Sequence, residues 1–109
     1  MARSRSANYC VVLTTYAREP VGKAIIDALL TARLAACIQV LPIRSFYSWK
    51  GKVVRDAEKL MLIKARAPQF RRIRDTILRL HDYEVPEVIR IPIDAGSSAY
   101  LDWIKQATR

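Results

Sequence analysis

Short runs of β-branched and aromatic residues are the first pattern visible along the chain. They are typical of strands, and they predict four strands, over residues 8–16, 36–50, 53–66 and 87–93. The second strand is expected to be interrupted at Pro42, because proline cannot donate a hydrogen bond to a sheet ladder. Lys50-Gly51-Lys52 supplies a turn between the second and third strands, so these two are predicted to form a hairpin.

Apolar residues at steps of three and four lie between these strands and predict helices. The first helix begins at Pro20 and ends near Leu34, and the second begins at Pro68. The predicted apolar side of the second helix consists of Phe70, Ile73, Ile77 and Leu78. A cap at Ser97 or Ser98 begins a short terminal helix.

This order of elements, βαββαβ followed by a C-terminal helix, is the ferredoxin-like arrangement of the α+β class, with an antiparallel sheet. The first and third strands then lie at the centre of the sheet, and the second and fourth strands lie at its edges. Proline positions agree with this topology, because Pro42 and Pro92 fall on the two predicted edge strands.

The two predicted central strands are apolar on both faces. Val11 and Leu13 oppose Val12 on the first strand, and Leu60 opposes Met61 on the third. Helices cover only one face of such a sheet, so the other face would be polar in a monomer. Burial of about 400 Å² of that face per subunit would contribute about 10 kcal/mol before association costs. The pattern therefore predicts self-association through the open face.

Length and composition narrow the class of protein. A chain of 109 residues fits one domain, predicted over residues 8–109 after a loose tail at residues 1–7. No apolar run is long enough for a signal peptide or a membrane span, so a cytoplasmic protein without a membrane partner is expected. Cys10 and Cys37 form no CxxC pair and are interpreted as reduced thiols.

The formal net charge of +9 favours acidic partners, and five arginines form one positive helix face: Arg66, Arg71, Arg72, Arg74 and Arg79. RNA-recognition domains of this fold stack bases on aromatic residues of the central strands, but residues 60–65 contain none. Nucleic acid is therefore not an expected partner. The chain has only three glycines and no Gly-rich phosphate loop or nucleophile–base set, so no enzyme activity is expected.

Three motifs occur in an order that is specific to one family. They are Leu34-Ala35-Ala36-Cys37, Tyr47-Ser48-Trp49-Lys50-Gly51-Lys52 and His81-Asp82-Tyr83-Glu84-Val85-Pro86-Glu87-Val88-Ile89. The chain resembles the CutA family of divalent-cation tolerance proteins. The resemblance implies a cytoplasmic homotrimer with sheets packed around a threefold axis, clefts between subunits, and a likeness to PII signalling trimers. It also implies a link to divalent metals, with copper(II) as the leading candidate.

The resemblance carries a metal site over only in part. Metal-binding members are thought to use a cysteine late in the first strand, where this chain has Thr14 and Thr15, and a histidine that corresponds to His81. The candidate metal ligands are His81, Glu84, Glu87 and Cys37. Imidazole suits Cu(II), carboxylates supply oxygen ligands, and thiols suit Cu(I). The alternative for His81 is a surface histidine that closes a helix.

The second candidate site is the intersubunit cleft. The resemblance assigns to it Tyr47, Trp49, Glu58, Lys64 and Tyr83, together with Glu84 and Glu87. Lys64 stands in an otherwise apolar strand, so its ammonium group is expected to pair with Glu58 or Glu87, or with an anionic ligand. The alternatives are a structural ion pair and aromatic residues that only pack the interface.

Two functions follow from these sites. The first is a homotrimeric divalent-cation tolerance protein that binds metal in response to metal ions. The second is a PII-like signalling trimer that binds a small anionic ligand in the cleft and is read by an unidentified protein partner.

Overall fold

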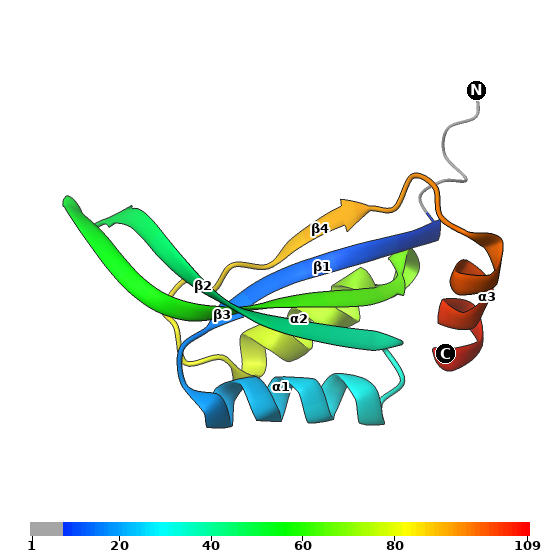
Figure 1. Ribbon diagram of the computed structural model, residues 1–109. Coiled ribbons are helices and arrows are strands. Elements are labelled where there is room, and N and C mark those ends of the chain that lie inside the picture. The colour runs from blue at the N-terminus through cyan, green and yellow to red at the C-terminus, as the bar shows by residue number, and fades with distance from the viewer. Residues whose placement is uncertain (1–7) are drawn as a thin grey trace.

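The computed structural model describes residues 8–109, and the tail predicted for residues 1–7 lies outside this range. The elements in chain order are β1 (Tyr9–Tyr16), α1 (Glu19–Thr31), β2 (Cys37–Trp49), β3 (Lys52–Arg66), the 3-10 turn η2 (Ala67–Gln69), α2 (Phe70–Leu80), β4 (Ile89–Pro92) and α3 (Ser98–Ala107). The βαββαβ order with a C-terminal helix is confirmed (Figure 1).

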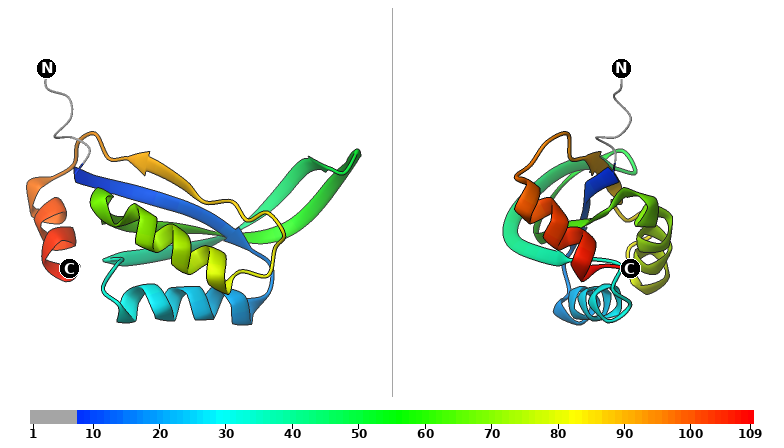
Figure 2. Two further views of the ribbon diagram at one scale, coloured as in Figure 1. Left: turned by 180° about the vertical axis from the view of Figure 1, so that it is seen from behind. Right: turned by 90° about the vertical axis from the view of Figure 1, so that its right-hand side faces the viewer.

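The sheet has the strand order β2-β3-β1-β4, and all three pairings are antiparallel. The central and edge strands are therefore those that the sequence predicts. Helices α1 and α2 cover one face, and α3 lies at the end of the sheet where β1 begins (Figures 1 and 2). The Ser97 side chain caps α3 by accepting a hydrogen bond from the backbone N–H of Tyr100.

The predicted interruption at Pro42 is wrong. Strand β2 runs unbroken from Cys37 to Trp49, and Pro42 stands opposite Lys59 in the ladder. Because β2 is an edge strand, half of its backbone N–H groups need no partner within the sheet, and a proline is tolerated there.

The β2–β3 hairpin extends beyond the rest of the sheet. On β3, only residues 59–66 pair with β1. Residues 43–58 of the hairpin therefore form a two-stranded ribbon that projects from the body (Figure 1). The turn consists of Lys50 and Gly51, with φ angles of 50° and 78°. Positive φ at both residues is the type I′ geometry, which matches the twist of two antiparallel strands.

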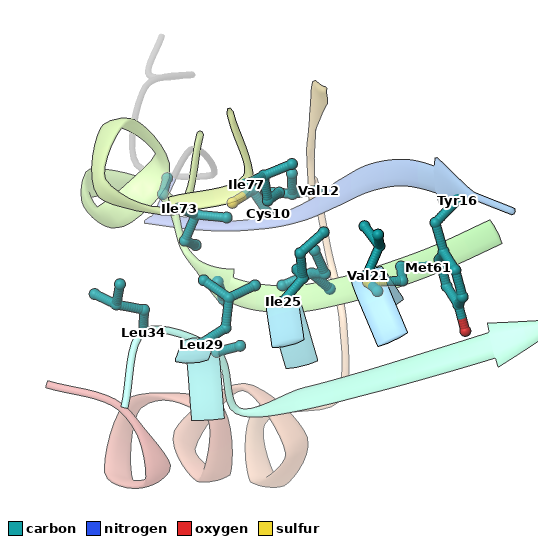
Figure 3. Packing of buried hydrophobic residues seen from close by; sticks show 14 residues of the cluster. Cys10, Val12, Tyr16, Val21, Ile25, Leu29, Leu34, Met61, Ile73 and Ile77 are labelled. Atoms are coloured by element: carbon teal, nitrogen blue, oxygen red, sulfur yellow. The ribbon is translucent and has the colours of Figure 1, made fainter. Parts of the chain in front are cut away.

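The core lies between the sheet and its two helices. Val12 of β1, Ile25 and Leu29 of α1, and Ile73 and Ile77 of α2 are fully buried there (Figure 3). The predicted apolar side of α2 is wrong at one position, because Leu78 is 48% exposed. A helix advances about 100° per residue, which turns Leu78 away from the buried stripe that contains Ile77.

The other sheet face has no helix over its centre. Register places Val11 of β1 beside Ile91 of β4, and Leu13 between Leu62 of β3 and Ile89 of β4. Ile89 and Ile91 are exposed, and the other three are only partly buried. This apolar surface is called the open face below.

Gly22 of α1 lies directly against the ring of Tyr16 of β1. A Cβ atom at Gly22 would lie 2.3 Å from a ring carbon of Tyr16, which is itself buried. We expect Gly22→Ala to lower the free energy of unfolding by about 1–3 kcal/mol in urea denaturation, despite the better helix propensity of alanine. Gly96→Ala is the matched control, because the nearest atom there is 3.3 Å away at the end of the Leu101 side chain. Equal losses in both variants would contradict this account.

Candidate functional site

A groove of about 710 Å³ lies between the projecting hairpin and the loop that follows α2. Its lining comprises Thr15, Ala17, Ser45, Phe46, Tyr47, Trp49, Asp56, Ala57, Glu58, Tyr83, Glu84, Val85 and Glu87. The hairpin supplies one wall and the loop over residues 83–87 supplies the other, so the groove joins segments that are distant in the sequence.

Two kinds of side chain dominate the groove. Four aromatic rings belong to Phe46, Tyr47, Trp49 and Tyr83, and four carboxylates belong to Asp56, Glu58, Glu84 and Glu87. Within residues 8–109, no lysine, arginine or histidine lines it. The groove therefore carries formal negative charge in a chain whose net charge is +9.

Tyrosine hydroxyls hold two of the carboxylates. The Tyr83 hydroxyl donates to Glu58 Oε2 at 2.5 Å, and the Tyr47 hydroxyl donates to Asp56 Oδ2. Burial, and then the hydrogen bond to Glu58, raises the pKa of Tyr83 above its usual range, so this hydroxyl stays a donor at neutral pH. Glu58 is itself buried, whereas Glu84 is exposed, with one oxygen 3.7 Å from Lys50 Nζ.

His81 supports the groove from behind its loop wall. Its side chain is fully buried, its Nε2 lies 2.7 Å from the backbone oxygen of Thr15, and its Nδ1 accepts the backbone N–H of Tyr83 at 3.1 Å. With Nδ1 accepting from the Tyr83 amide, Nε2 is the nitrogen that donates to the Thr15 oxygen. The ring also packs against Tyr83 at 4.5 Å between centroids. His81 thus ties the loop to the end of β1 and orients Tyr83.

The candidate metal ligands are not brought together in one chain. Glu84 and Glu87 lie on the groove, His81 lies behind it with both nitrogens engaged, and Cys37 begins β2. In the part of the chain that the structure describes, no group of three or more His, Cys, Asp or Glu side chains is arranged to hold a metal ion.

The residues predicted for the cleft divide into two places. Tyr47, Trp49, Glu58 and Tyr83 meet in the groove. Lys64 does not, because it stands six residues beyond Glu58 on β3, or about 20 Å at 3.3 Å per residue.

Within one chain, Lys64 contacts neither Glu58 nor Glu87, and the ion pair expected across subunits stays a prediction. Its ammonium donates to Gln39 Oε1 at 2.7 Å and lies 5.8 Å from the centre of the Tyr100 ring. A neutral amide and a ring face therefore accommodate the charge on the open face. This pairing depends on the β2–β3 register, in which Gln39 is opposite Leu62, the neighbour of Lys64 on the same face.

Two of the aromatic and acidic side chains that line the groove were not predicted from the sequence, namely Phe46 and Asp56. A signal for Asp56 exists, because it precedes Glu58 by two residues and strand alternation places both on one face. The sequence offers no comparable signal for Phe46.

Comparison with known proteins gives one consistent family. The model of the family described as "CutA1 divalent ion tolerance protein" matches residues 10–107. The divalent-cation tolerance protein CutA of Thermus thermophilus is 41% identical over 99 residues, which cover 90% of this chain and 96% of that protein. The human protein CutA is 42% identical over 95 residues, which cover 86% of this chain but only 53% of the human protein.

Solved structures agree with the fold. The divalent cation tolerance protein of Thermus thermophilus superposes with a TM-score of 0.87 at 40% identity, covering 93% of this chain and 99% of that chain. CutA1 from Oryza sativa superposes with a TM-score of 0.89 at 38% identity, covering 97% and 98%.

The relatives are named for different compartments. Curated relatives from Arabidopsis and rice are called chloroplastic, and this chain spans 59% and 56% of their lengths. A solved structure from Archaeoglobus fulgidus is called periplasmic; its TM-score is 0.89 at 33% identity, with coverage of 93% of this chain and 99% of that chain. No helix within residues 8–109 has the length and apolarity to cross a membrane.

The family description names tolerance to divalent ions. The match covers nearly all of the described residues, and the Thermus thermophilus relative, whose fold matches, is about 40% identical. The chain belongs to the CutA1 divalent ion tolerance protein family.

Proposed function

We propose that this protein is a homotrimer that binds divalent metal cations, copper(II) first among them, and thereby contributes to tolerance of metal ions. The observation that carries the proposal is the groove, which four carboxylates line in a chain of net charge +9; Lys50 lies at its rim, 3.7 Å from Glu84. Such a groove concentrates cations and repels anions. It therefore disfavours the small anionic ligand of a PII-like signalling trimer.

Glu84 and Glu87 are the proposed metal ligands within one subunit. Asp56 and Glu58 already accept hydrogen bonds from tyrosine hydroxyls, and both nitrogens of His81 are engaged in the fold. Water or a neighbouring subunit completes the coordination. Copper(II) is favoured because it binds most tightly among first-row divalent ions at a given set of nitrogen and oxygen ligands.

The open face supports the trimer. Its apolar residues on β1, β3 and β4 stand exposed or partly buried on the side that α1 and α2 do not cover (Figure 2). Packing three such faces together would remove this surface from water. We also propose that residues 8–109 form one domain and that the protein acts in the cytoplasm, where a protein partner reads its metal state.

Native mass spectrometry of the metal-free protein, with and without one equivalent of Cu(II) per subunit, tests the proposal. We expect a trimer that retains copper. We expect the double variant with Glu84→Gln and Glu87→Gln to bind copper with an affinity at least tenfold lower. Asp102→Asn is the control, because Asp102 is an exposed carboxylate on α3 outside the groove. Copper retention that is the same in all three proteins would contradict the assigned ligands, and a monomer would contradict the assembly.

A further inference from the structure

We propose that the groove also binds an aliphatic polyamine, a molecule in which several ammonium groups are joined by methylene stems. The inference rests on the cation-attracting groove of the proposed function and names a second class of cation for it. Three features of the groove support this ligand: the spread of its charges, its aromatic wall, and an ammonium group that already contacts its rim.

The carboxylates are spread over two walls of the groove. Asp56 and Glu58 belong to β3 in the hairpin, whereas Glu84 and Glu87 belong to the loop after α2. A metal ion binds ligands within about 2–2.6 Å and neutralises only those it contacts. In residues 8–109 the acidic side chains form no three-ligand cluster, so a single ion leaves part of this charge unmatched. A cation with several separated charges matches both walls.

The aromatic rings of the groove provide an apolar surface on which the methylene stems can pack. Tyr47 and Trp49 lie on β2, and Tyr83 faces them from the loop. Alkyl stems pack on aromatic surfaces, and ammonium groups are attracted to ring faces within about 6 Å. A hydrated metal ion would leave these apolar surfaces in water.

The ammonium group of the Lys50 side chain lies at the rim of the groove. Lys50 Nζ lies 5.6 Å from the centre of the Trp49 ring and 3.7 Å from a carboxylate oxygen of Glu84. Both members of this ion pair are about 70% exposed, and such surface pairs contribute little to stability. The terminal ammonium of a polyamine can therefore replace Lys50 on the same ring and carboxylate.

The size of the groove fits such a ligand. Its volume of about 710 Å³ falls within the ordinary range of small-molecule sites. A neutral aromatic ligand would fill the space but leave the carboxylates uncompensated, and an anion would be repelled.

Isothermal titration of the metal-free, full-length protein with spermidine tests the inference. We expect one site per subunit, with tighter binding of spermidine than of putrescine, which has one ammonium group fewer, and with weaker binding at higher salt. Trp49→Leu is expected to weaken spermidine binding about fivefold, and Glu87→Gln to weaken it by a similar factor.

Matched controls lie outside the groove. Trp103→Leu removes the other tryptophan, which is exposed to a similar degree, and Asp102→Asn removes an exposed carboxylate. Both are expected to bind spermidine as the unaltered protein does. Absence of binding, or equal weakening in Trp49→Leu and Trp103→Leu, overturns the inference. Groove amides that are protected from hydrogen exchange without ligand, together with absence of binding, would identify a neighbouring subunit as the occupant instead.

The two proposals fail separately. A trimer that takes up copper in the mass spectrum but releases no heat with spermidine retains the metal function and loses the polyamine site. A protein that binds spermidine but takes up no divalent metal retains the polyamine site and loses the metal function.

Discussion

Replacing Leu62 with glutamate is expected to convert the proposed trimer into folded monomers. Leu62 lies at the centre of the open face, between Leu13 and Gln39 in the sheet register. Association would bury one new carboxylate per subunit among apolar side chains; the nearby Lys64 is already engaged with Gln39, and even a buried ion pair with it carries a desolvation cost, so we expect a penalty of several kcal/mol per subunit. The association constant should therefore fall at least about a thousandfold. Sedimentation velocity at matched protein concentration measures this change, and far-UV circular dichroism checks that the monomer stays folded.

Leu78→Glu is the control for this experiment. Leu78 is an exposed leucine on α2, on the helical side of the subunit, and its replacement leaves the open face intact. We expect Leu78→Glu to remain a trimer. If Leu62→Glu also remains a trimer, the subunits associate through some other surface.

His81→Ala is expected to lower the free energy of unfolding by about 2–4 kcal/mol in the complete absence of metal. The change removes a fully buried ring and leaves the Thr15 carbonyl and the Tyr83 amide without their partner. Urea denaturation in the presence of a chelator measures this loss. Protein concentration must be held constant, because assembly contributes to apparent stability.

Asp82→Ala is the neighbouring control for His81→Ala. Asp82 is exposed; its Oδ2 pairs with Arg18 at 3.2 Å, and its Oδ1 lies 3.5 Å from His81 Nδ1 without replacing the contacts that His81 makes to Thr15 and Tyr83, so we expect a loss below about 1 kcal/mol. If His81→Ala is as stable as this control yet no longer takes up copper, His81 is a metal ligand after all. A large loss of stability means instead that reduced copper uptake by His81→Ala does not identify a ligand.

The sequence was sufficient for the fold because each element carries its own pattern. Strand runs, helical periods and the Lys50-Gly51 turn are local signals, and the edge prolines Pro42 and Pro92 agreed with the observed strand order. The errors are local as well. Pro42 was expected to break a strand that tolerates it at an edge, and Leu78 lies one position beyond the buried stripe of α2.

The site was predictable only in part, because its contacts depend on three-dimensional register. The motif residues Tyr47, Trp49 and Tyr83 do meet in one groove. The partner of Lys64 is a glutamine across the strand pair, and the partner of His81 is a backbone carbonyl 66 residues away. Neither type of partner has a compositional signature, so no inspection of charges along the chain would have identified them.

In the proposed trimer, the projecting ribbon of residues 43–58 would link ligand affinity to subunit concentration. A two-stranded ribbon without a third strand or a covering helix is only marginally stable in water. This ribbon carries the aromatic wall of the groove, so we expect a dissociated subunit in solution to present that wall in a less ordered form. Any contact with a neighbouring subunit that steadies the ribbon tightens binding in the groove, and by thermodynamic reciprocity a bound cation favours assembly by the same factor.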